Sequence, residues 1–439
     1  MKIYKILGFL LVVSIFITAC QPQSVETVAP VTELPVATPT EMLEPQEVVN
    51  LVVWNTWSEF SANAFQEILD DFNATHEYIQ VSQQSQPLAD YDAKLIQAIS
   101  QGTGPDLINT YPEQASNFID EGFLVNLSDY INDPEIGIEG FRESVSDGVY
   151  KEITQWNGDV YMMPMLVGGE VFYYNKTLLD NLNLEVPTTW KELEESGRII
   201  LAETGKPAFG FDSISDGFQV LISQNGSGYI NTDTMTVEYN NPIALEQLTW
   251  YCGLVKEGVF RLVGEDMYFS NPFGSQAVAS YAGSAAGYSF VKSAVNEQFE
   301  FGVAPIPQGG TQEYISAWGQ RWIIFKSTDA KQRAAYEFLK YMISPEVLAK
   351  WAVGFGGVPA FQAAIDHPVF QEYLANNPAA MAQRLQIQRT GFIPAPKGSA
   401  AVKNAIGKAV ISACTDLVTP EEALKIAEEE GNTELAAYK

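Results

Sequence analysis

Aromatic and charged side chains gather at places where the sequence predicts the ends of strands. They are Trp57, Glu59, Tyr111, Glu113, Trp318 and Arg321. An aromatic ring covers the apolar C–H face of a sugar, while carboxylate and guanidinium groups hydrogen-bond its hydroxyls. The set therefore predicts a site for a polyhydroxylated ligand. Each tryptophan taken alone also fits a core, and each charged residue a solvated surface, so the hypothesis depends on the joint pattern.

Signatures of catalysis are missing from the sequence. There is no G-x-S-x-G, phosphate-loop, H-E-x-x-H or C-x-x-C motif, and Gly102-Thr103-Gly104 lacks the third glycine of a dinucleotide fingerprint. Two histidines, His76 and His367, argue against a Ser-His-Asp triad and, with only three cysteines, against a zinc site. We expect no metal, no cofactor and no enzymatic activity. The 54 acidic residues still leave a glycosidase with paired carboxylates as an alternative.

Composition sets further bounds. The chain has 439 residues, of which 46% are hydrophobic, so it is long enough for two or three domains or one two-lobed body. Its formal net charge of −29 repels phosphate backbones. We therefore expect no nucleic-acid partner, and the charge argues weakly against a strongly anionic ligand.

The elements that must position these side chains are organised around residues 156–176, WNGDVYMMPMLVGGEVFYYNK. Asn157-Gly158-Asp159 is a turn signal between two apolar runs, and Val171–Tyr174 favour an extended strand. Gly168 and Gly169 allow a backbone or a ligand to come close. We interpret this stretch as a crossing between two lobes beside a cleft. The alternative is a core hairpin inside one domain.

A strand–helix–strand–helix–strand series precedes that stretch. Strands are predicted at 48–54, 78–83 and 106–109, with intervening helices that end near Asn73 and at Ser100. This order predicts a mostly parallel sheet with helices on its faces. Ligands of such sheets bind beyond the carboxyl ends of the strands. The rule points to Trp57-Ser58-Glu59 and Tyr111-Pro112-Glu113.

The α/β pattern restarts after residue 176. Thr189 and Glu192 fit a capping box that opens a helix, and further helices are predicted at 242–256, at 329–343 and from Pro420. Strands are predicted at 301–306 and 317–325. Residues 305–307 and 354–359 are rich in Pro or Gly and mark two more candidate crossings. Cys252 and Cys414 fall in predicted helices, where a disulfide and two buried thiols both fit the sequence.

The first 47 residues look like a targeting segment and a tether. Lys2 and Lys5 precede an apolar run that is too short to be an ordinary membrane-spanning helix. The sequence Ile17-Thr18-Ala19-Cys20 resembles the bacterial lipobox, which implies a signal peptide at 1–20 and a lipid on Cys20. The alternative is a plain secretory signal. Residues 21–47 contain five prolines and no Lys or Arg, which predicts a disordered tether.

An ordered series of motifs spans nearly all of residues 48–439. It consists of LVVWNTW, YDAKLIQAISQGTGPDLI, NGDVYMMPMLVGGEVFYYNKTLL, VPTTWKEL, FGVAPIPQGG, AAYEFLKYMISPE, GFGGVPA and TPEEAL. The series resembles the bacterial extracellular solute-binding proteins of family 1, the ligand-capturing lipoproteins of sugar importers driven by ATP hydrolysis. Each motif is weak alone, and their order makes the resemblance specific.

The resemblance implies an α/β, two-lobed periplasmic-binding-protein fold of type II, with a sugar in the cleft between discontinuous lobes. Its crossings would lie near Gln155–Pro164, Ala304–Gln308 and Gly356–Pro359. One lobe would comprise 48–157 and 308–357, and the other 158–307 and 358–439.

Within the family the chain looks most similar to binders of glycerol phosphates and polyols, and to maltose- or trehalose-type binders. Tyr91, Tyr111 and Ser284 match ligand-contacting positions of the first group. The acid that follows the tyrosine there is displaced here to Glu113, which lies where maltose-type binders carry a sugar-binding acid. The phosphate-binding arginine of the first group has no match, because residues 396–401 read PKGSAA. The resemblance therefore implies a neutral sugar, with a glycerol phosphate or polyol as the alternative.

We predict a lipid-anchored, extracytoplasmic monomer that captures a neutral mono- or oligosaccharide and delivers it to the membrane permease of an ABC importer. Trp57 and Trp318 would stack on the ring, and residues of both lobes would bond its hydroxyls. The full predicted site is Trp57, Ser58, Glu59, Tyr91, Tyr111, Glu113, Gly169, Glu170, Ser284, Trp318 and Arg321. The remote alternatives are a membrane-anchored glycosidase and a sensory receptor subunit.

Overall fold

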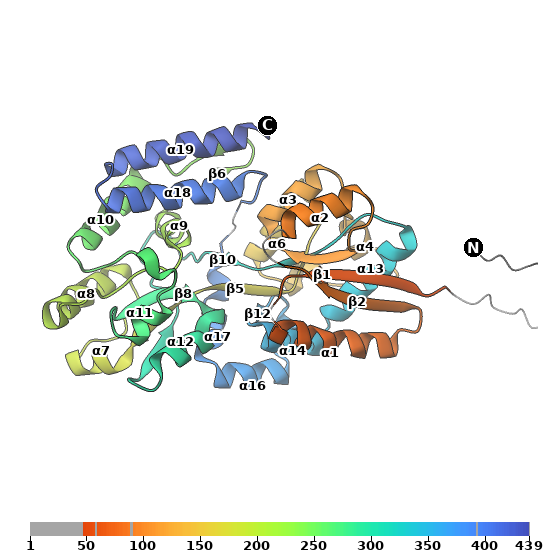
Figure 1. The fold of residues 1–439 in the computed structure, drawn as a ribbon, viewed down its shortest axis with the longest axis horizontal. Coiled ribbons are helices and arrows are strands. Elements are labelled where there is room, and N and C mark those ends of the chain that lie inside the picture. The colour runs from red at the N-terminus through yellow and green to blue at the C-terminus, as the bar shows by residue number, and fades with distance from the viewer. Residues whose placement is uncertain (1–46, 58, 88–90, 392–393, 439) are drawn as a thin grey trace, which may run out of the picture. The chain divides into compact units, whose positions relative to one another are not determined.

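A computed structural model of the protein describes residues 47–57, 59–87, 91–391 and 394–438 (Figure 1). The predicted signal peptide, Cys20, all but the last residue of the tether and Ser58 lie outside the described residues. Within the described ranges, no helix has both the length and the apolar character needed to cross a membrane.

The first of two five-stranded sheets is built mainly from the start of the chain. Its strand order is β2-β1-β3-β11-β4. The strands are β1 Val49–Asn55, β2 Ile79–Ser85, β3 Leu107–Thr110, β4 Met163–Pro164 and β11 Arg321–Ile324. β1 pairs in parallel with β2 and β3, whereas β11 runs antiparallel to β3 and β4. The predicted parallel α/β series is confirmed for β1 to β3, and the antiparallel strand joins from a distant part of the sequence.

Helices cover this first sheet. They are α1 Glu59–Thr75, α2 Tyr91–Ser100, α3 Pro112–Asp120, α4 Ser128–Ile131, α5 Phe141–Ser144, α6 Asp147–Ile153, α13 Asp329–Met342 and α14 Pro345–Phe355. α1 packs on β2 and α14, and α13 packs on β1 and β11. The apolar face that the sequence predicts for α1 is buried, since Phe65, Leu69 and Phe72 have no exposed surface.

The second sheet is arranged around β5, Leu166–Asn175, which lies at the centre of the ribbon in Figure 1. Four strands pair with it in antiparallel fashion: β8 Ser280–Ser284, β9 Phe301–Ala304, β10 Ala317–Trp318 and β12 Val358–Pro359. The predicted strand at Val171–Tyr174 is confirmed. The turn before it is also confirmed, because Asn157 and Gly158 have φ angles of +55° and +86° and Trp156 bridges to Asp159.

The remaining elements pack mostly around the second sheet. They are α7 Lys176–Leu182, α8 Trp190–Thr204, α9 Ile214–Gln224, β6 Ile230–Asn231, β7 Thr236–Val237, α10 Pro242–Lys256, η2 Gly264–Asp266, α11 Ser270–Gly274, η3 Ala285–Gly287, α12 Tyr288–Val295, α15 Gln362–Ile365, α16 Pro368–Asn376, α17 Pro378–Gln386, η4 Ile387–Arg389, α18 Ser399–Cys414 and α19 Pro420–Ala436. The predicted capping box of Thr189 and Glu192 opens α8. A disulfide joins Cys252 of α10 to Cys414 of α18, which decides between the two states left open by the sequence.

Within the described ranges, the chain passes between the two sheets at three places. β4 is separated from β5 only by Met165, β10 is separated from β11 by Gly319-Gln320, and α14 is separated from β12 by Gly356-Gly357. Both glycines of the last passage have positive φ angles, +84° and +134°, which side-chain-bearing residues adopt at a cost.

The second passage lies later in the chain than the expected crossing at 304–308. The prolines there do end a strand, but the next strand, β10, still pairs with β5. Strand pairing, and not the proline positions, therefore decides where the chain changes sheets. The lobe boundaries drawn from the sequence stay a prediction.

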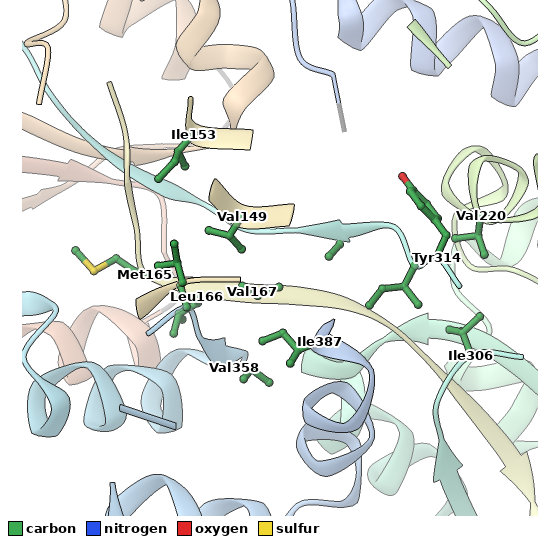
Figure 2. Close-up of a cluster of buried hydrophobic side chains, with 14 of the residues drawn as sticks. Val149, Ile153, Met165, Leu166, Val167, Val220, Ile306, Tyr314, Val358 and Ile387 are labelled. Atoms are coloured by element: carbon green, nitrogen blue, oxygen red, sulfur yellow. The ribbon is translucent and has the colours of Figure 1, made fainter. Parts of the chain in front are cut away.

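Hydrophobic packing is continuous along β5, as Figure 2 shows. Val149 from α6 lies near Leu166 and Val167, and Val358 of β12 and Ile387 of η4 lie on the other side of the strand. All five side chains are at most 6% exposed. This core fixes β5 between the elements that line the candidate site.

Candidate functional site

Two adjoining hollows share the side chains of Tyr111 and Trp318. The first, which we call the charged hollow, is lined by Tyr111, Pro112, Glu113, Glu152, Asp216, Gln219, Tyr229, Ser316, Ala317, Trp318, Pro394, Ala395, Ser399, Ala400 and Lys403. The second, the uncharged hollow, is lined by Asn109, Tyr111, Met165, Leu166, Gly168, Ser284, Ala285, Ala286, Trp318, Gly319, Gln320, Trp351, Phe355, Gly356 and Gly357. Counted with the open solvent at their mouths, the two hollows enclose about 570 and 720 Å3.

The start of α3 brings two predicted site residues into the charged hollow. β3 ends at Thr110, Tyr111 is the N-cap residue of α3, and Pro112 occupies the first helical position. Proline is suited to that position because its fixed φ matches the helix and its missing N–H would have no partner there. Glu113 then falls in the first turn. Both Tyr111 and Glu113 therefore lie at the carboxyl end of a parallel strand, as the sequence predicted.

An ion pair from two other helices lines the same hollow. Lys403 of α18 places its Nζ atom 2.8 Å from Oδ1 of Asp216 in α9. Oδ2 of Asp216 accepts a hydrogen bond from Ser213 Oγ at 2.5 Å. Burial by itself lowers the pKa of Lys403, but the combined effect of Asp216, Glu113 and Glu170 outweighs it, so the pKa of this lysine is raised and the ammonium stays charged.

The carboxyl of Glu113 faces this ion pair without a cation of its own. Among the described residues, no Lys, Arg or His nitrogen lies within ion-pair distance of it. Burial raises the pKa of Glu113, and the partial attraction of Lys403 does not cancel that rise. The charged hollow thus holds one carboxylate paired with lysine and one that is not.

The fourth charged group of the hollow, Glu152, forms a buried ion pair with Arg321. Arg321 donates from Nε and Nη2 to Oε2 of Glu152, at 2.8 and 2.5 Å, and from Nη1 to the Leu166 carbonyl at 2.6 Å. The pKa of Glu152 is raised by burial, with Arg321 opposing that rise. Since Arg321 is 2% exposed, its nitrogens are committed to the protein. We therefore do not carry forward the prediction that Arg321 bonds ligand hydroxyls directly.

Several residues that line the hollows carry a buried polar atom without a hydrogen-bond partner. In the charged hollow these are the hydroxyls of Tyr229, Ser316 and Ser399. In the uncharged hollow they are Asn109 Oδ1 and Gln320 Oε1. A buried polar group without a partner costs free energy. A ligand that carries hydroxyls would supply the missing partners on both sides.

Aromatic rings dominate the uncharged hollow. Trp351 and Phe355 of α14 stack with ring centroids 4.7 Å apart, and Trp318 of β10 and Tyr111 complete the apolar surface. Gly168 lies opposite Trp318, and a Cβ there would come within 3.2 Å of the indole nitrogen. The glycine therefore makes room for the tryptophan, which is the close approach that the sequence indicated.

Four of the predicted site residues line the hollows: Tyr111, Glu113, Ser284 and Trp318. Ser284 reaches the uncharged hollow from the end of β8, and its Oγ also accepts from the Ala286 amide. Strands and helices that are far apart in sequence are thus brought to one place. Their roles as ligand contacts stay a prediction.

The other predicted residues lie elsewhere. Trp57 does not line either hollow and packs its ring against Trp351 and Phe355, with centroids 5.1 and 5.6 Å away. Glu59 is exposed at the start of α1, and Tyr91 packs against a cluster of buried hydrophobic side chains that includes Trp54.

Gly169 and Glu170 lie on β5 behind the hollows. A Cβ on Gly169 would come within 2.9 Å of the Gln383 amide nitrogen. Glu170 is 4% exposed, and its Oε2 has no partner. Burial, with added repulsion from Asp216 and Asp212, raises the pKa of Glu170 well above its usual range.

The sequence did not single out Asp216, Tyr229, Ser399 or Lys403. These residues come from three separate stretches, and none stands at a predicted strand end. Lys403 lies in α18, just after the PKGSAA segment in which a phosphate-binding arginine was sought. The lysine of the charged hollow thus lies two residues beyond the segment that lacks the arginine. Across the described residues, no group of three or more His, Cys, Asp or Glu is arranged to hold a metal ion.

The sequence of the chain is similar to those of known proteins. The model of a family described as bacterial extracellular solute-binding protein matches residues 67–382, which is well over half of the chain. The sn-glycerol-3-phosphate-binding periplasmic protein UgpB of Pectobacterium atrosepticum is 20% identical over 90% of this chain and 93% of its own. The maltotriose-binding protein of Pyrococcus abyssi is 23% identical over 72% of this chain and 68% of its own.

Solved structures give the same result for the fold. The cyclic alpha-maltosyl-1,6-maltose binding protein of Arthrobacter globiformis has a TM-score of 0.78 and 23% identity, covering 89% of this chain and all of that one. The sugar-binding protein MalE of Xanthomonas citri also has a TM-score of 0.78, with 18% identity over 89% of this chain and 98% of its own. The predicted α/β periplasmic-binding-protein fold is confirmed.

Proposed function

The chain belongs to the bacterial extracellular solute-binding protein family, and from this premise we propose that it captures a saccharide in the two hollows and delivers it to the permease of an ABC importer. One observation carries the proposal. The two hollows meet at the rings of Tyr111 and Trp318 and are flanked by buried polar atoms that lack partners.

Saccharide chemistry fits this combination of surfaces. The rings of Trp318, Tyr111 and Phe355 offer apolar faces to sugar C–H groups. Asn109 Oδ1 and Gln320 Oε1 offer acceptors to sugar hydroxyls, and the free hydroxyls of the charged hollow can both donate and accept. The names of the maltotriose- and maltose-type relatives support this ligand class.

Residues from both sides of the three passages contribute to the hollows, and this supports capture by closure. Glu113 follows the first sheet, whereas Ser284 ends β8 of the second. We propose that the two lobes close on the sugar by small changes at the passages, among them Gly356-Gly357. A ligand drives such closure only by contacting the closed state better than the open one. No residue is given a catalytic role, since the relatives described above are named as binding proteins.

Anchoring completes the proposal. Cys20 would carry a lipid, and residues 21–47 would give the folded body reach from the membrane. The protein would then act as a monomer on the extracytoplasmic side, next to its permease.

A second candidate ligand is a glycerol phosphate or a polyol. Lys403 favours it, because a lysine ammonium and three free hydroxyls in one hollow resemble an anion cradle. The name of the UgpB relative points the same way. The two carboxylates beside Lys403 argue against it, and we rank the neutral sugar first.

A ligand screen tests the proposal. The purified protein is heated with neutral mono- and oligosaccharides, polyols and sn-glycerol 3-phosphate, and hits are confirmed by calorimetry. A ligand that binds only the folded state raises the melting temperature by mass action. We expect a rise with a neutral saccharide. A rise with glycerol phosphate alone would replace the lead ligand with the second candidate, and no rise with any of these compounds would refute both.

A further inference from the structure

Lys403 is the cationic residue among those that line the charged hollow, and its ammonium group already forms an ion pair with Asp216. Its Nζ lies 2.8 Å from Asp216 Oδ1, while 42% of the lysine side chain stays exposed. The ammonium therefore faces the hollow with its charge balanced by a neighbour from a different helix. An anionic ligand group would have to compete with that carboxylate.

Asp216 cannot easily swing away from the lysine. Its side chain is only 9% exposed, and Ser213 Oγ donates to its second oxygen at 2.5 Å. It also lies in the first turn of α9, where a carboxylate is favoured by the helix dipole. The carboxylate is thus held in place from two sides.

Glu113 adds a second negative group from the opposite side of the hollow. It comes from α3, whereas Asp216 and Lys403 come from α9 and α18. The remaining acid of the lining, Glu152, is bonded to Arg321 and adds little charge of its own. The residues that decide the charge of the hollow are therefore Lys403, Asp216 and Glu113.

Three residues with an unpartnered hydroxyl line the hollow together with Lys403. The hydroxyls of Tyr229, Ser316 and Ser399 are buried, unpartnered and part of the same lining. Together with a free lysine, they would supply one charge and several hydrogen bonds to an oxyanion. The two carboxylates are what set this hollow apart from an anion site.

We propose that Asp216 and Glu113 are specificity-determining residues that keep Lys403 from binding an anionic group, so that the charged hollow accepts sugar hydroxyls and rejects phosphorylated ligands. This inference rests on the proposed function for the identity of the accepted ligand. The rejection of anions follows from the three charged side chains themselves and is measured separately.

The experiment measures the binding of anionic probes to the unmodified protein and to variants that lack one or both carboxylates. Inorganic phosphate and sn-glycerol 3-phosphate are titrated by calorimetry into the full chain and into Glu113→Gln, Asp216→Asn and the double variant. Gln and Asn keep the shape of the acids and remove the charge, while one acceptor oxygen becomes an NH2 donor. We expect the double variant to bind the phosphates at least tenfold more tightly than the unmodified protein, and each single variant to lie between the two.

Two controls separate this selection from simpler explanations. Asp212→Asn removes the same charge near α9 from a residue that lines neither hollow, and we expect it to gain nothing. Lys403→Met in the double variant should abolish the gained phosphate binding. Circular dichroism and the melting temperature show whether each variant is folded. If the double variant is unfolded, the phosphate titration is carried out on Glu113→Gln alone.

The outcomes bear on the inference and on the function separately. Folded charge variants that gain no phosphate binding would overturn the inference, as would an equal gain in Asp212→Asn or a gain that survives Lys403→Met. Failure of the unmodified protein to bind any neutral saccharide would refute the proposed function alone. Strong binding of glycerol phosphate by the unmodified protein would overturn the inference and leave the second candidate ligand.

Discussion

The charged and uncharged hollows share two aromatic side chains but are built by different means. The uncharged hollow is formed by α14, the end of β8 and the glycine-rich passages beside β5. The charged hollow is formed by side chains of α3, α6, α9 and α18, which come from distant stretches of the chain. The uncharged hollow is thus made by backbone shape and ring packing, and the charged hollow by ionic groups that need partners.

The difference shows that the charged hollow needs more stabilising interactions around it than the uncharged hollow. Rings in an apolar surface need only close packing, whereas buried carboxylates need counterions and donors. The charged hollow accordingly depends on the Glu152–Arg321 pair, the Asp216–Lys403 pair and the disulfide that ties α18 to α10. We expect mutations of this support to have larger effects than those at the aromatic surface.

The largest effect is expected at Arg321, which stands between the hollows. It bonds Glu152 on the charged side and the Leu166 carbonyl on the uncharged side. Arg321→Met leaves Glu152 buried without its cation, and we expect the free energy of unfolding to fall by about 3–5 kcal/mol. Urea denaturation measures it.

The matched control is Arg198→Met, which breaks ion pairs to Glu194 and Glu257 at a side chain that is 47% exposed. Exposed pairs contribute at most about 1 kcal/mol. Equal losses in the two variants would show that the pair between the hollows carries no special structural weight.

The next effect concerns the disulfide between Cys252 and Cys414. It closes a long loop, with a sequence separation of 162, and holds the helix that carries Lys403 and Ser399. Replacing both cysteines by Ala should lower the free energy of unfolding by about 2–4 kcal/mol. Denaturation with and without reductant measures it.

Reductant should destabilise the unmodified protein in the same way and leave the double-Ala variant unchanged. A melting temperature of the unmodified protein that does not respond to reductant after full reduction of the thiols would contradict the expected role of the disulfide.

A smaller effect, on binding and not on folding, is expected at the residue that the hollows share. Trp318→Ala removes the ring that faces both, and we expect saccharide affinity to fall tenfold to a hundredfold, about 1.4–2.8 kcal/mol. Calorimetry with the saccharide identified in the screen measures it.

Phe290→Ala is the control, since this ring is 73% exposed on α12 and lines neither hollow. Unchanged affinity in Trp318→Ala would remove the aromatic junction from the proposed site. Trp57→Ala, whose ring lies behind Trp351 and Phe355, should have a weaker effect on affinity than Trp318→Ala.

The smallest effect is a pH dependence next to the charged hollow. Burial raises the pKa of Asp212 to about 6, above its unfolded value of about 3.9. The folded state therefore binds this proton more tightly, so stability is lost as the pH rises through that window. Between pH 5 and pH 7 the loss should be about 1.3 kcal/mol larger in the unmodified protein than in Asp212→Asn.

Urea denaturation at pH 5, 6 and 7 measures this difference. The exposed Asp233→Asn serves as the control and should follow the unmodified protein. Parallel pH profiles for Asp212→Asn and the unmodified protein would place the titration elsewhere in the molecule.

The sequence predicted the parts of the site that depend on local pattern. Tyr111 and Glu113 were found because they follow a strand of a parallel series, and Gly168 because a glycine in a strand marks a close approach. Trp318 followed from its place beside a predicted strand. Arg321 was chosen by the same rule, but its side chain turns inward to a buried acid, and no spacing rule links it to Glu152.

Sequence alone determined the α/β class, a strand at Val171–Tyr174, the helix caps and the family, because these depend on short-range periodicity and on ordered motifs. Only the tertiary structure decided which charges meet. Asp216 and Lys403 meet because α9 packs on α18, and Glu113 of α3 lines the same hollow. The disulfide forms because α10 and α18 are neighbours. Such pairings are set by the packing of the whole chain, which is why the charge of the binding site could not be known from the order of its residues.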